Sequence, residues 1–256
     1  MKKILILFFA VVIALPAYAG IGISLWGGYT SVDMQEVNNH IGEVESGIKS
    51  SGLTPTVDTY KHAGFASLDI DFKLLPAITA GARGSVVICA PASAEVTGDL
   101  TSIDPSYGAG SLSYNMNGVL LPLMGGVKVV LGAPVSPFEI TASVHAGYGL
   151  YFITRGISLD SDVGGKARAD IPYIGSGFVG EATAGVTAGI VPLIDIVAYG
   201  GYRIANASSV KADASVVESA LEIDIPEGET LKDSEGDDIR VNMSGFTAGV
   251  GLRIRF

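Results

Sequence analysis

The carboxy-terminal segment of this chain constrains its fold more than any other. Residues 246–256 read Phe-Thr-Ala-Gly-Val-Gly-Leu-Arg-Ile-Arg-Phe, and every second residue is apolar. This period-two alternation predicts a β-strand with one apolar face, while the other face carries Arg253 and Arg255. An apolar outer face with a polar inner face is the alternation of a transmembrane β-barrel, in which lipid lies outside and each backbone group pairs with a neighbouring strand.

The amino-terminal residues predict export. The chain begins Met-Lys-Lys, continues with a short apolar run over residues 4–15 and has the small-x-small sequence Ala-Tyr-Ala at residues 17–19. We therefore expect a cleaved signal peptide over residues 1–19 and a single barrel domain over residues 20–256. An uncleaved anchor helix is the alternative, but the apolar run is shorter than the roughly 20 residues that span a bilayer.

Composition narrows the class of protein. Glycine accounts for 34 of 256 residues, roughly twice its usual share. The hydrophobic residues are spread over alternate positions, as in membrane proteins built of strands. The formal net charge is −10, so nucleic acid is not expected as a partner. The only cysteine, Cys89, cannot form an internal disulfide and is interpreted as a small buried residue.

The chain divides into alternating segments separated by three short proline-containing turns, at residues 75–77, 132–137 and 191–194, and by four long polar connections. This organisation predicts an all-β fold, an eight-stranded antiparallel transmembrane barrel with short periplasmic turns and long extracellular loops. The predicted strands cover about residues 21–29, 65–74, 78–88, 112–131, 138–157, 175–190, 195–210 and 239–256.

The alternation also predicts which side chains face the lumen. Phe138 and Tyr148 share an apolar face and lie ten residues apart, a climb of roughly 25 Å in a tilted strand, which matches the height of a membrane's apolar band. The predicted strand over residues 112–131 breaks this rule, because Asn115 and Asn117 differ in parity from Lys128. A β-bulge near residues 121–122 is expected to restore it.

The predicted inward positions form a charge network of nearly balanced sign. Its members are Asp69, Asp71, Lys73, Arg83, Lys128, Glu139, His145, Glu181, Asp195, Arg203, Arg253 and Arg255. An eight-stranded barrel is only just wide enough for its side chains to fill the interior, so these charges are expected to pair across the lumen. The alternative is a narrow or gated pathway for solutes.

The terminal strand resembles that of the small bacterial outer-membrane β-barrel superfamily, which includes the OmpA transmembrane domain, OmpX and OmpW. Gly251, Ile254 and Phe256 are similar to the glycine, hydrophobic and final aromatic positions of its assembly signal, although Gly249 departs from the polar residue often found earlier in that signal. The resemblance covers residues 20–256. It implies an outer-membrane location, contact with outer-membrane lipid and lipopolysaccharide, and recognition by the barrel-assembly machinery.

The first long connection contains an apolar stripe at helical spacing, formed by Met34, Val37, Ile41, Val44 and Ile48. Asp33 and Glu36 are positioned for a capping box at its start. The spacing predicts an amphipathic helix in the first extracellular loop. We expect this helix to cap the barrel mouth; the alternative is a membrane-lying or partner-binding helix, which usually carries more basic residues.

The last long connection, residues 211–238, is strongly acidic. Clustered oxygens at residues 233–238 raise the possibility of a calcium site, but their spacing does not match a twelve-residue calcium loop. We interpret the segment as a solvated acidic loop and expect no metal or cofactor.

The histidines argue against catalysis. Barrel enzymes that modify lipid A require a histidine with a serine and a carboxylate on the lipid-facing side, whereas His145, Ser143 and Glu139 are all predicted to point inward. The sequence therefore predicts a non-enzymatic outer-membrane barrel with a largely filled lumen, whose loops serve envelope structure or surface binding. A small porin-like channel is the main alternative and a lipid A-modifying enzyme the next. The sequence identifies no extracellular partner.

Overall fold

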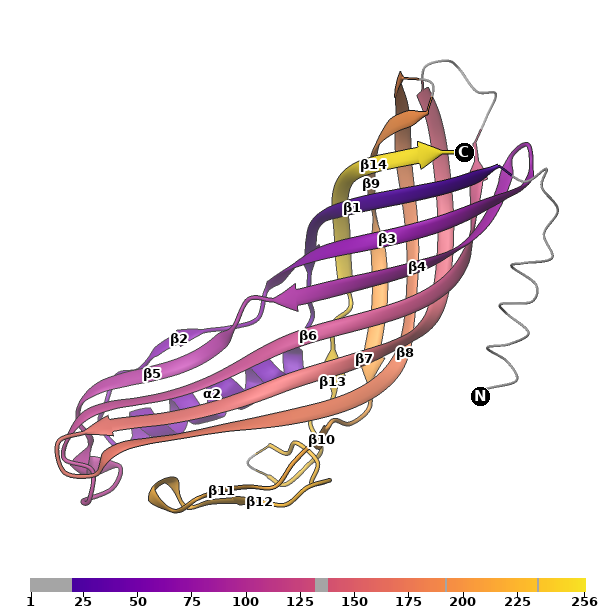
Figure 1. Ribbon diagram of the computed structural model, residues 1–256. Helices are drawn as coiled ribbons and strands as arrows, with labels where there is room; N and C mark the ends of the chain where they lie inside the picture. The colour runs from indigo at the N-terminus through magenta and orange to yellow at the C-terminus, as the bar shows by residue number, and fades with distance from the viewer. Residues whose placement is uncertain (1–19, 132–137, 192, 234) are drawn as a thin grey trace.

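The structure is a computed structural model that describes residues 20–131, 138–191, 193–233 and 235–256. Its main feature is a closed ring of antiparallel strands (Figure 1). In ring order these strands are β1 (Ile21–Ser31), β3 (His62–Leu75), β4 (Ile78–Cys89), β6 (Ala109–Val130), β7 (Phe138–Ser161), β8 (Gly165–Val191), β9 (Ile194–Ala207) and β14 (Gly245–Arg255). The ring closes because β14 pairs with β1, which leaves no strand edge exposed to lipid. The predicted eight-stranded fold is confirmed.

Three strands continue well beyond the others at the end that carries the long connections (Figure 1). The extended parts of β6, β7 and β8 form a sheet with β5 (Ala92–Asp99) and β2 (Thr56–Asp58). The predicted helix, α2 (Gln35–Ser50), packs against this sheet. We call this region the extracellular arm, because long connections are expected on the outside of the cell.

The remaining elements are short. A 3-10 turn, η1 (Leu100–Ser102), follows β5. The segment between β9 and β14, which includes the acidic last connection, contains β10 (Lys211–Ala212), β11 (Val216–Glu218), η2 (Ser219–Leu221), β12 (Ile223–Ile225) and β13 (Val241–Asn242). β10 pairs with β8 and β13 with β9, so this segment is tied to strands of the ring at both of its ends.

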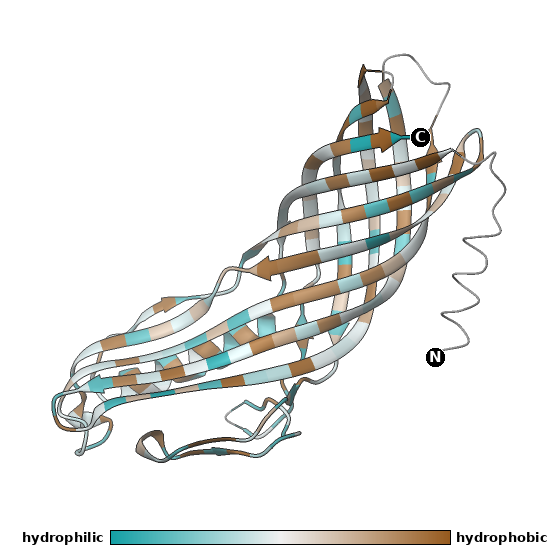
Figure 2. Ribbon diagram, viewed as in Figure 1, coloured by the Kyte–Doolittle hydropathy of each residue, from teal (hydrophilic) through white to brown (hydrophobic). Residues whose placement is uncertain are grey.

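The outer surface of the ring is apolar where the strands cross the bilayer, and hydropathy alternates along each strand (Figure 2). The exposed side chains of this band include Leu25, Leu68, Val127, Ile140, Val144, Val186, Ile204 and Val250. Tyr29, Tyr148, Phe178, Tyr202 and Phe246 are exposed towards the extracellular arm, and Phe138 and Phe256 towards the short turns. Aromatic rows at both margins are typical of a band that lies in lipid.

The predicted bulge in β6 is wrong. β6 pairs with β7 in unbroken register from Gly110 opposite Ser161 to Val130 opposite Thr141. Lys128 points inward, whereas Asn115 and Asn117 lie on the outer face. Asn115 pairs with Ser93 of β5 in the extracellular arm, and Asn117 lies directly beside this part of β6. There the outer face meets water and the inner face meets an apolar core, so polar side chains belong outside. The surroundings of the strand change along its length, and its register does not.

The predicted capping box of the helix is also wrong. Met34 occupies the N-cap position of α2, and no side-chain hydrogen bond caps the helix there. The Glu36 carboxylate accepts a hydrogen bond from the backbone N–H of Arg240 at 2.6 Å, and Asp33 accepts one from the Asn242 amide at 3.1 Å. Both carboxylates therefore join the start of the helix to the segment that enters the last strand.

Several strand boundaries differ from those predicted. β8 begins at Gly165, well before predicted residue 175, because its first half forms a hairpin with β7 in the extracellular arm. The last barrel strand begins at Gly245 rather than 239, because residues 241–242 form the separate strand β13. The predicted turn at residues 132–137 and the residue Pro192 lie outside the described residues.

Candidate functional site

Four charged side chains meet in the middle of the lumen. Asp69 and Arg83 are opposite each other on β3 and β4, and Glu181 and Arg203 are opposite each other on β8 and β9. Arg83 binds Asp69 through two hydrogen bonds of 2.8 Å and also reaches Glu181 across the lumen. Arg203 donates to the second Glu181 oxygen at 2.9 Å. We call these four residues the central tetrad; it joins two opposite walls of the barrel.

The central tetrad is almost completely removed from solvent. Asp69, Arg83 and Arg203 are 1% exposed, and Glu181 is 3% exposed. Two arginines and two carboxylates carry no net charge, so the group avoids the large cost of an uncompensated buried charge. The planar fork of each guanidinium suits this arrangement, because it can bind carboxylates through two parallel hydrogen bonds.

Aromatic rings cover the two guanidiniums. Arg83 lies over the indole of Trp26 at 4.1 Å and Arg203 over the ring of Phe65 at 5.5 Å. Tyr199 packs edge-on against both Trp26 and Phe65. These cation–π contacts place apolar carbon around the arginines where water would otherwise solvate them.

Most of the other predicted lumen residues pair closer to the short turns. Lys128 binds Asp71. Arg255 binds Asp195 at 2.7 Å, and Arg253 lies 3.9 Å from Glu139.

Two predicted lumen residues are outside these pairs. Lys73 is exposed at the end of β3 and takes part in none of the ion pairs found among the described residues. His145 is buried opposite Glu181 on the neighbouring strand, and its Nδ1 has no hydrogen-bond partner in the described part of the chain.

One small cavity lies beside the central tetrad. Its volume of about 20 Å³ is room for roughly one water molecule, and it lies between the tetrad and the short-turn end. Its lining is rich in hydroxyl groups, from Ser24, Thr141, Ser143, Thr183 and Thr187.

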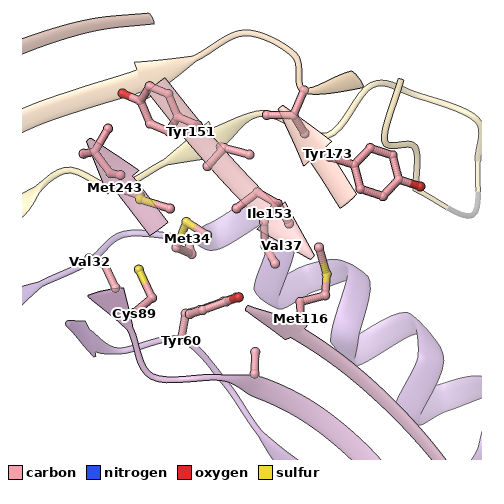
Figure 3. Close-up of a cluster of buried hydrophobic side chains, with 14 of the residues drawn as sticks. Val32, Met34, Val37, Tyr60, Cys89, Met116, Tyr151, Ile153, Tyr173 and Met243 are labelled. Carbon is pink, nitrogen blue, oxygen red and sulfur yellow. The ribbon is translucent and has the colours of Figure 1, made fainter. Parts of the chain in front are cut away.

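A second, apolar core lies on the extracellular side of the central tetrad and is drawn in Figure 3. We call it the arm core; its residues include Val32, Met34, Val37, Tyr60, Cys89, Met116, Tyr151, Ile153, Tyr173 and Met243. The helix α2 contributes Val37, Ile41 and Ile48 as buried residues, and Val44 is half-buried. The sequence interpretation missed the inward positions of β7 in this core, although their signal is visible as an apolar run at Tyr151, Ile153 and Ile157 with the parity of the lumen residues.

A buried histidine connects α2 to the wall of the extracellular arm. Nε2 of His40 is 2.8 Å from the Tyr114 hydroxyl, and its Nδ1 is 3.3 Å from Glu43. Burial lowers the pKa of His40, and the nearby Glu43 carboxylate opposes this shift only in part. Burial also raises the pKa of Tyr114. The neutral imidazole is therefore favoured in the folded arm.

A hollow of about 1550 Å³ lies outside the arm core, between α2 and the acidic last connection. Asp33, Glu36, Glu43, Asp237 and Asp238 contribute carboxylates to its lining. At the position of the possible calcium site, Asp233 instead accepts hydrogen bonds from the backbone N–H groups of Glu235 and Asp237, and Ser234 lies outside the described residues. Within the described ranges no group of histidine, cysteine and acidic residues is arranged to hold a metal ion.

The residues of the predicted assembly signal lie on β14 next to β1. The Phe256 N–H donates to the Ile21 carbonyl at 2.8 Å, and Ile254 is opposite Ile23. Gly251 faces inward against Trp26, and a Cβ at Gly251 would overlap the Trp26 side chain. Glycine at this position therefore has a packing role inside the barrel.

Comparison with known proteins finds similarity among solved structures. No protein-family model matches the chain, and no curated protein sequence matches it. Among solved structures, it is similar to the outer membrane protein OprG from Pseudomonas aeruginosa, with 11% identity, a TM-score of 0.42 and coverage of 93% of this chain and 96% of that one. The outer membrane protease OmpT from Escherichia coli gives 10% identity, a TM-score of 0.42 and coverage of 94% and 98%. Neisserial surface protein A gives 8% identity, a TM-score of 0.36 and coverage of 93% and 97%.

These values transfer no activity to this chain. The closed ring and its lipid-suited outer band make the chain an outer-membrane β-barrel protein. No helix within the described ranges is long and apolar enough to cross a membrane.

Proposed function

We propose that this outer-membrane barrel is a closed, non-enzymatic scaffold that presents its extracellular arm at the cell surface, where the arm serves envelope structure or surface binding. The observation that supports this function is the central tetrad, which bridges opposite walls of the lumen. A solute pathway would have to pass both the tetrad and the arm core.

The energetic cost of opening supports a closed barrel. A passing solute would have to separate Arg83 or Arg203 from a carboxylate that is itself almost fully buried. Separating one partner of a buried pair costs about 3 to 5 kcal/mol. The arm core adds a second barrier, because α2 would have to withdraw buried side chains such as Val37 and Ile41 from it.

The positions of the histidines support a non-enzymatic role. Ser143 donates to or accepts from Thr183 at 2.6 Å, and His145 lacks a hydrogen bond at Nδ1 among the described residues. His62 stacks on Tyr29 at 5.6 Å, and His40 bonds to Tyr114. None of these contacts places a serine hydroxyl on a histidine that a carboxylate orients, which is the arrangement nucleophilic hydrolysis requires.

The partners in this proposal follow from the surfaces. Outer-membrane lipid and lipopolysaccharide would contact the apolar band, and the barrel-assembly machinery would recognise β14 with Gly251, Ile254 and Phe256. The extracellular arm would carry any specific binding, because it is the part of the barrel that extends beyond the membrane.

The test is single-channel conductance of the refolded chain, residues 20–256, in a planar bilayer. A heat-dependent shift in gel mobility confirms that the barrel is folded. We expect a folded barrel with no steady openings. A matched Arg83→Ala, Glu181→Ala double variant, which removes the side chains that cross the lumen, reports whether an opened barrel would be detected. Discrete openings of the unaltered protein would contradict the proposal and favour a small channel.

A further inference from the structure

Hydrogen-bond donors that lack an acceptor lie around the small cavity beside the central tetrad. Ser24 and Trp26 of β1 line this cavity and are 4% and 7% exposed. The Ser24 hydroxyl and the Trp26 indole N–H have no hydrogen-bond partner among the described residues. Arg253 also lines the cavity, and its buried Nε–H has no partner within the described ranges either. A buried polar group without a partner is costly, so three of them around one cavity point to an occupant.

The seam where the first and last strands of the ring meet brings these donors together. Ser24 of β1 is directly opposite Arg253 of β14, and Trp26 follows Ser24 on the same inward face. Gly185 of β8 lines the cavity as well, and a Cβ there would lie 3.5 Å from the Thr141 hydroxyl. Because Gly185 has no side chain, the space beside that hydroxyl stays free.

The lining of the cavity offers few free acceptors to these donors. Asp69 is the only carboxylate among the described residues that line it, and both of its oxygens already accept hydrogen bonds from Arg83 at 2.8 Å. The hydroxyls of Ser143 and Thr183 bond to each other at 2.6 Å. Indole and guanidinium N–H groups can only donate. An anion can accept from all of these groups at once, whereas a water molecule must also find acceptors for its own protons.

The charges around the cavity favour an anion too. Arg83, Lys128 and Arg253 line it together with a single carboxylate. Lys128 binds Asp71, whereas the Arg253 guanidinium lies 3.9 Å from Glu139, the longest of the ion pairs found among the described residues. Glu139 is partly exposed, so water can solvate its carboxylate if Arg253 turns towards another anion.

We propose that this cavity binds one chloride ion through the Arg253 guanidinium, the Trp26 N–H and the Ser24 hydroxyl. Hydrogen bonds to a charged acceptor are stronger than those to a neutral one, so an anion satisfies these donors well. The volume of about 20 Å³ accommodates a single-atom anion and excludes a tetrahedral oxyanion such as sulfate.

The short-turn end of the lumen offers a route to this site. The side chains of Glu139 and Arg255 at that end are partly exposed, so water reaches them. On the other side of the cavity, the almost fully buried Arg83 and Glu181 of the central tetrad occupy the lumen. The chloride ion would therefore enter past the short turns and stop at the tetrad.

The test uses the fluorescence of Trp26, which is the only tryptophan of the chain and part of the proposed site. The refolded chain, residues 20–256, is titrated with sodium bromide, because the heavy bromide ion quenches indole emission and is only slightly larger than chloride. Sodium sulfate keeps the ionic strength constant. We expect quenching that saturates with bromide and that sodium chloride reverses. Acrylamide, a neutral quencher, should have little effect, because the Trp26 side chain is buried.

Two variants and one control assign the quenching to this cavity. Arg253→Gln should weaken bromide binding by about 10- to 100-fold and Ser24→Ala by about 10-fold, as expected for the loss of a hydrogen bond to a charged group. Lys73→Gln is the matched control, because it removes the same charge from the end of β3, and Lys73 does not line the cavity. It should bind bromide as the unaltered protein does.

Two results would overturn the proposal. One is quenching of the folded, unaltered barrel that is absent, or that rises linearly with bromide and does not respond to chloride, which would mean that the cavity holds water only. The other is saturable quenching that Arg253→Gln and Ser24→Ala leave unchanged, because bromide would then bind elsewhere. Gel mobility before and after heating identifies folded protein in every case.

Discussion

Replacing Glu181 with glutamine tests the central tetrad directly. Glu181→Gln preserves shape but removes the carboxylate that binds both Arg83 and Arg203. Arg83 keeps Asp69, whereas Arg203 loses the only ion-pair partner it has among the described residues. The variant therefore buries one uncompensated charge, and the free energy of unfolding should fall by about 3 to 5 kcal/mol.

Urea unfolding of the barrel in lipid vesicles, followed by heat-dependent gel mobility, measures this loss. Glu139→Gln is the matched control, because the Arg253–Glu139 pair spans 3.9 Å and both side chains are partly exposed, so it should cost at most about 1 kcal/mol. Adding Arg203→Met to Glu181→Gln should recover most of the lost unfolding free energy, because it removes the Arg203 guanidinium that has no carboxylate partner in the single variant. If Glu181→Gln and Glu139→Gln cost the same, or if the second substitution does not rescue, the reasoning is refuted.

Three further predictions concern the helix, a buried histidine and the strand faces. Gly47→Ala should raise the unfolding free energy by up to about 1 kcal/mol in urea titrations, because Gly47 lies within α2 and a Cβ there meets no atom within 4 Å. Burial lowers the pKa of His40, so the imidazole binds a proton more readily in the unfolded arm than in the folded arm. The stability of the arm should therefore be fully present above the ordinary histidine pKa of about 6.5 and fall as the pH drops towards the lowered pKa of the folded state. Hydrogen exchange in α2 should become faster over this pH range, and His40→Gln should abolish the pH dependence. Val127→Lys should lower the free energy of unfolding in urea titrations by about 2 to 4 kcal/mol, because the Val127 side chain faces lipid. Asn117→Lys, on the same face of β6, should change the free energy of unfolding by less than about 0.5 kcal/mol.

Much of the fold could be predicted because the strands of a membrane barrel require apolar and polar residues to alternate along the sequence. Alternation identified the strands, and residues 75–77, with their proline, marked a short turn of the ring. The same alternation selected Asp69, Arg83, Glu181 and Arg203 as inward-facing, which is where the structure places them. Side-chain period and turn chemistry are local properties, so they are accessible from sequence.

The pairing of those charges could not be predicted from sequence. Arg83 meets Glu181 across the lumen, 98 residues away along the chain, and that meeting depends on strand tilt and stagger around the whole ring. The prediction of a capping box at the start of α2 failed for a similar reason. Asp33 and Glu36 have the right local spacing for a capping box, but Asn242 and the Arg240 backbone compete for the same carboxylates. Local rules cannot include partners that only the closed ring brings close.

The absence of the predicted β-bulge shows that one strand can line two different cores without a change of register. On β7 the inward side chains change from polar Ser143 and His145 to apolar Tyr151 and Ile153 without a change of register. Below this change lipid lies outside and the interior must be polar; above it water lies outside and the interior must be apolar. The two cores can therefore act independently. Arg83–Asp69 and Glu181–Arg203 are neighbours on adjacent strands within the membrane, so the contacts of the central tetrad do not depend on α2. Under the proposed function, the extracellular arm would therefore be free to change its surface while the lumen stays closed.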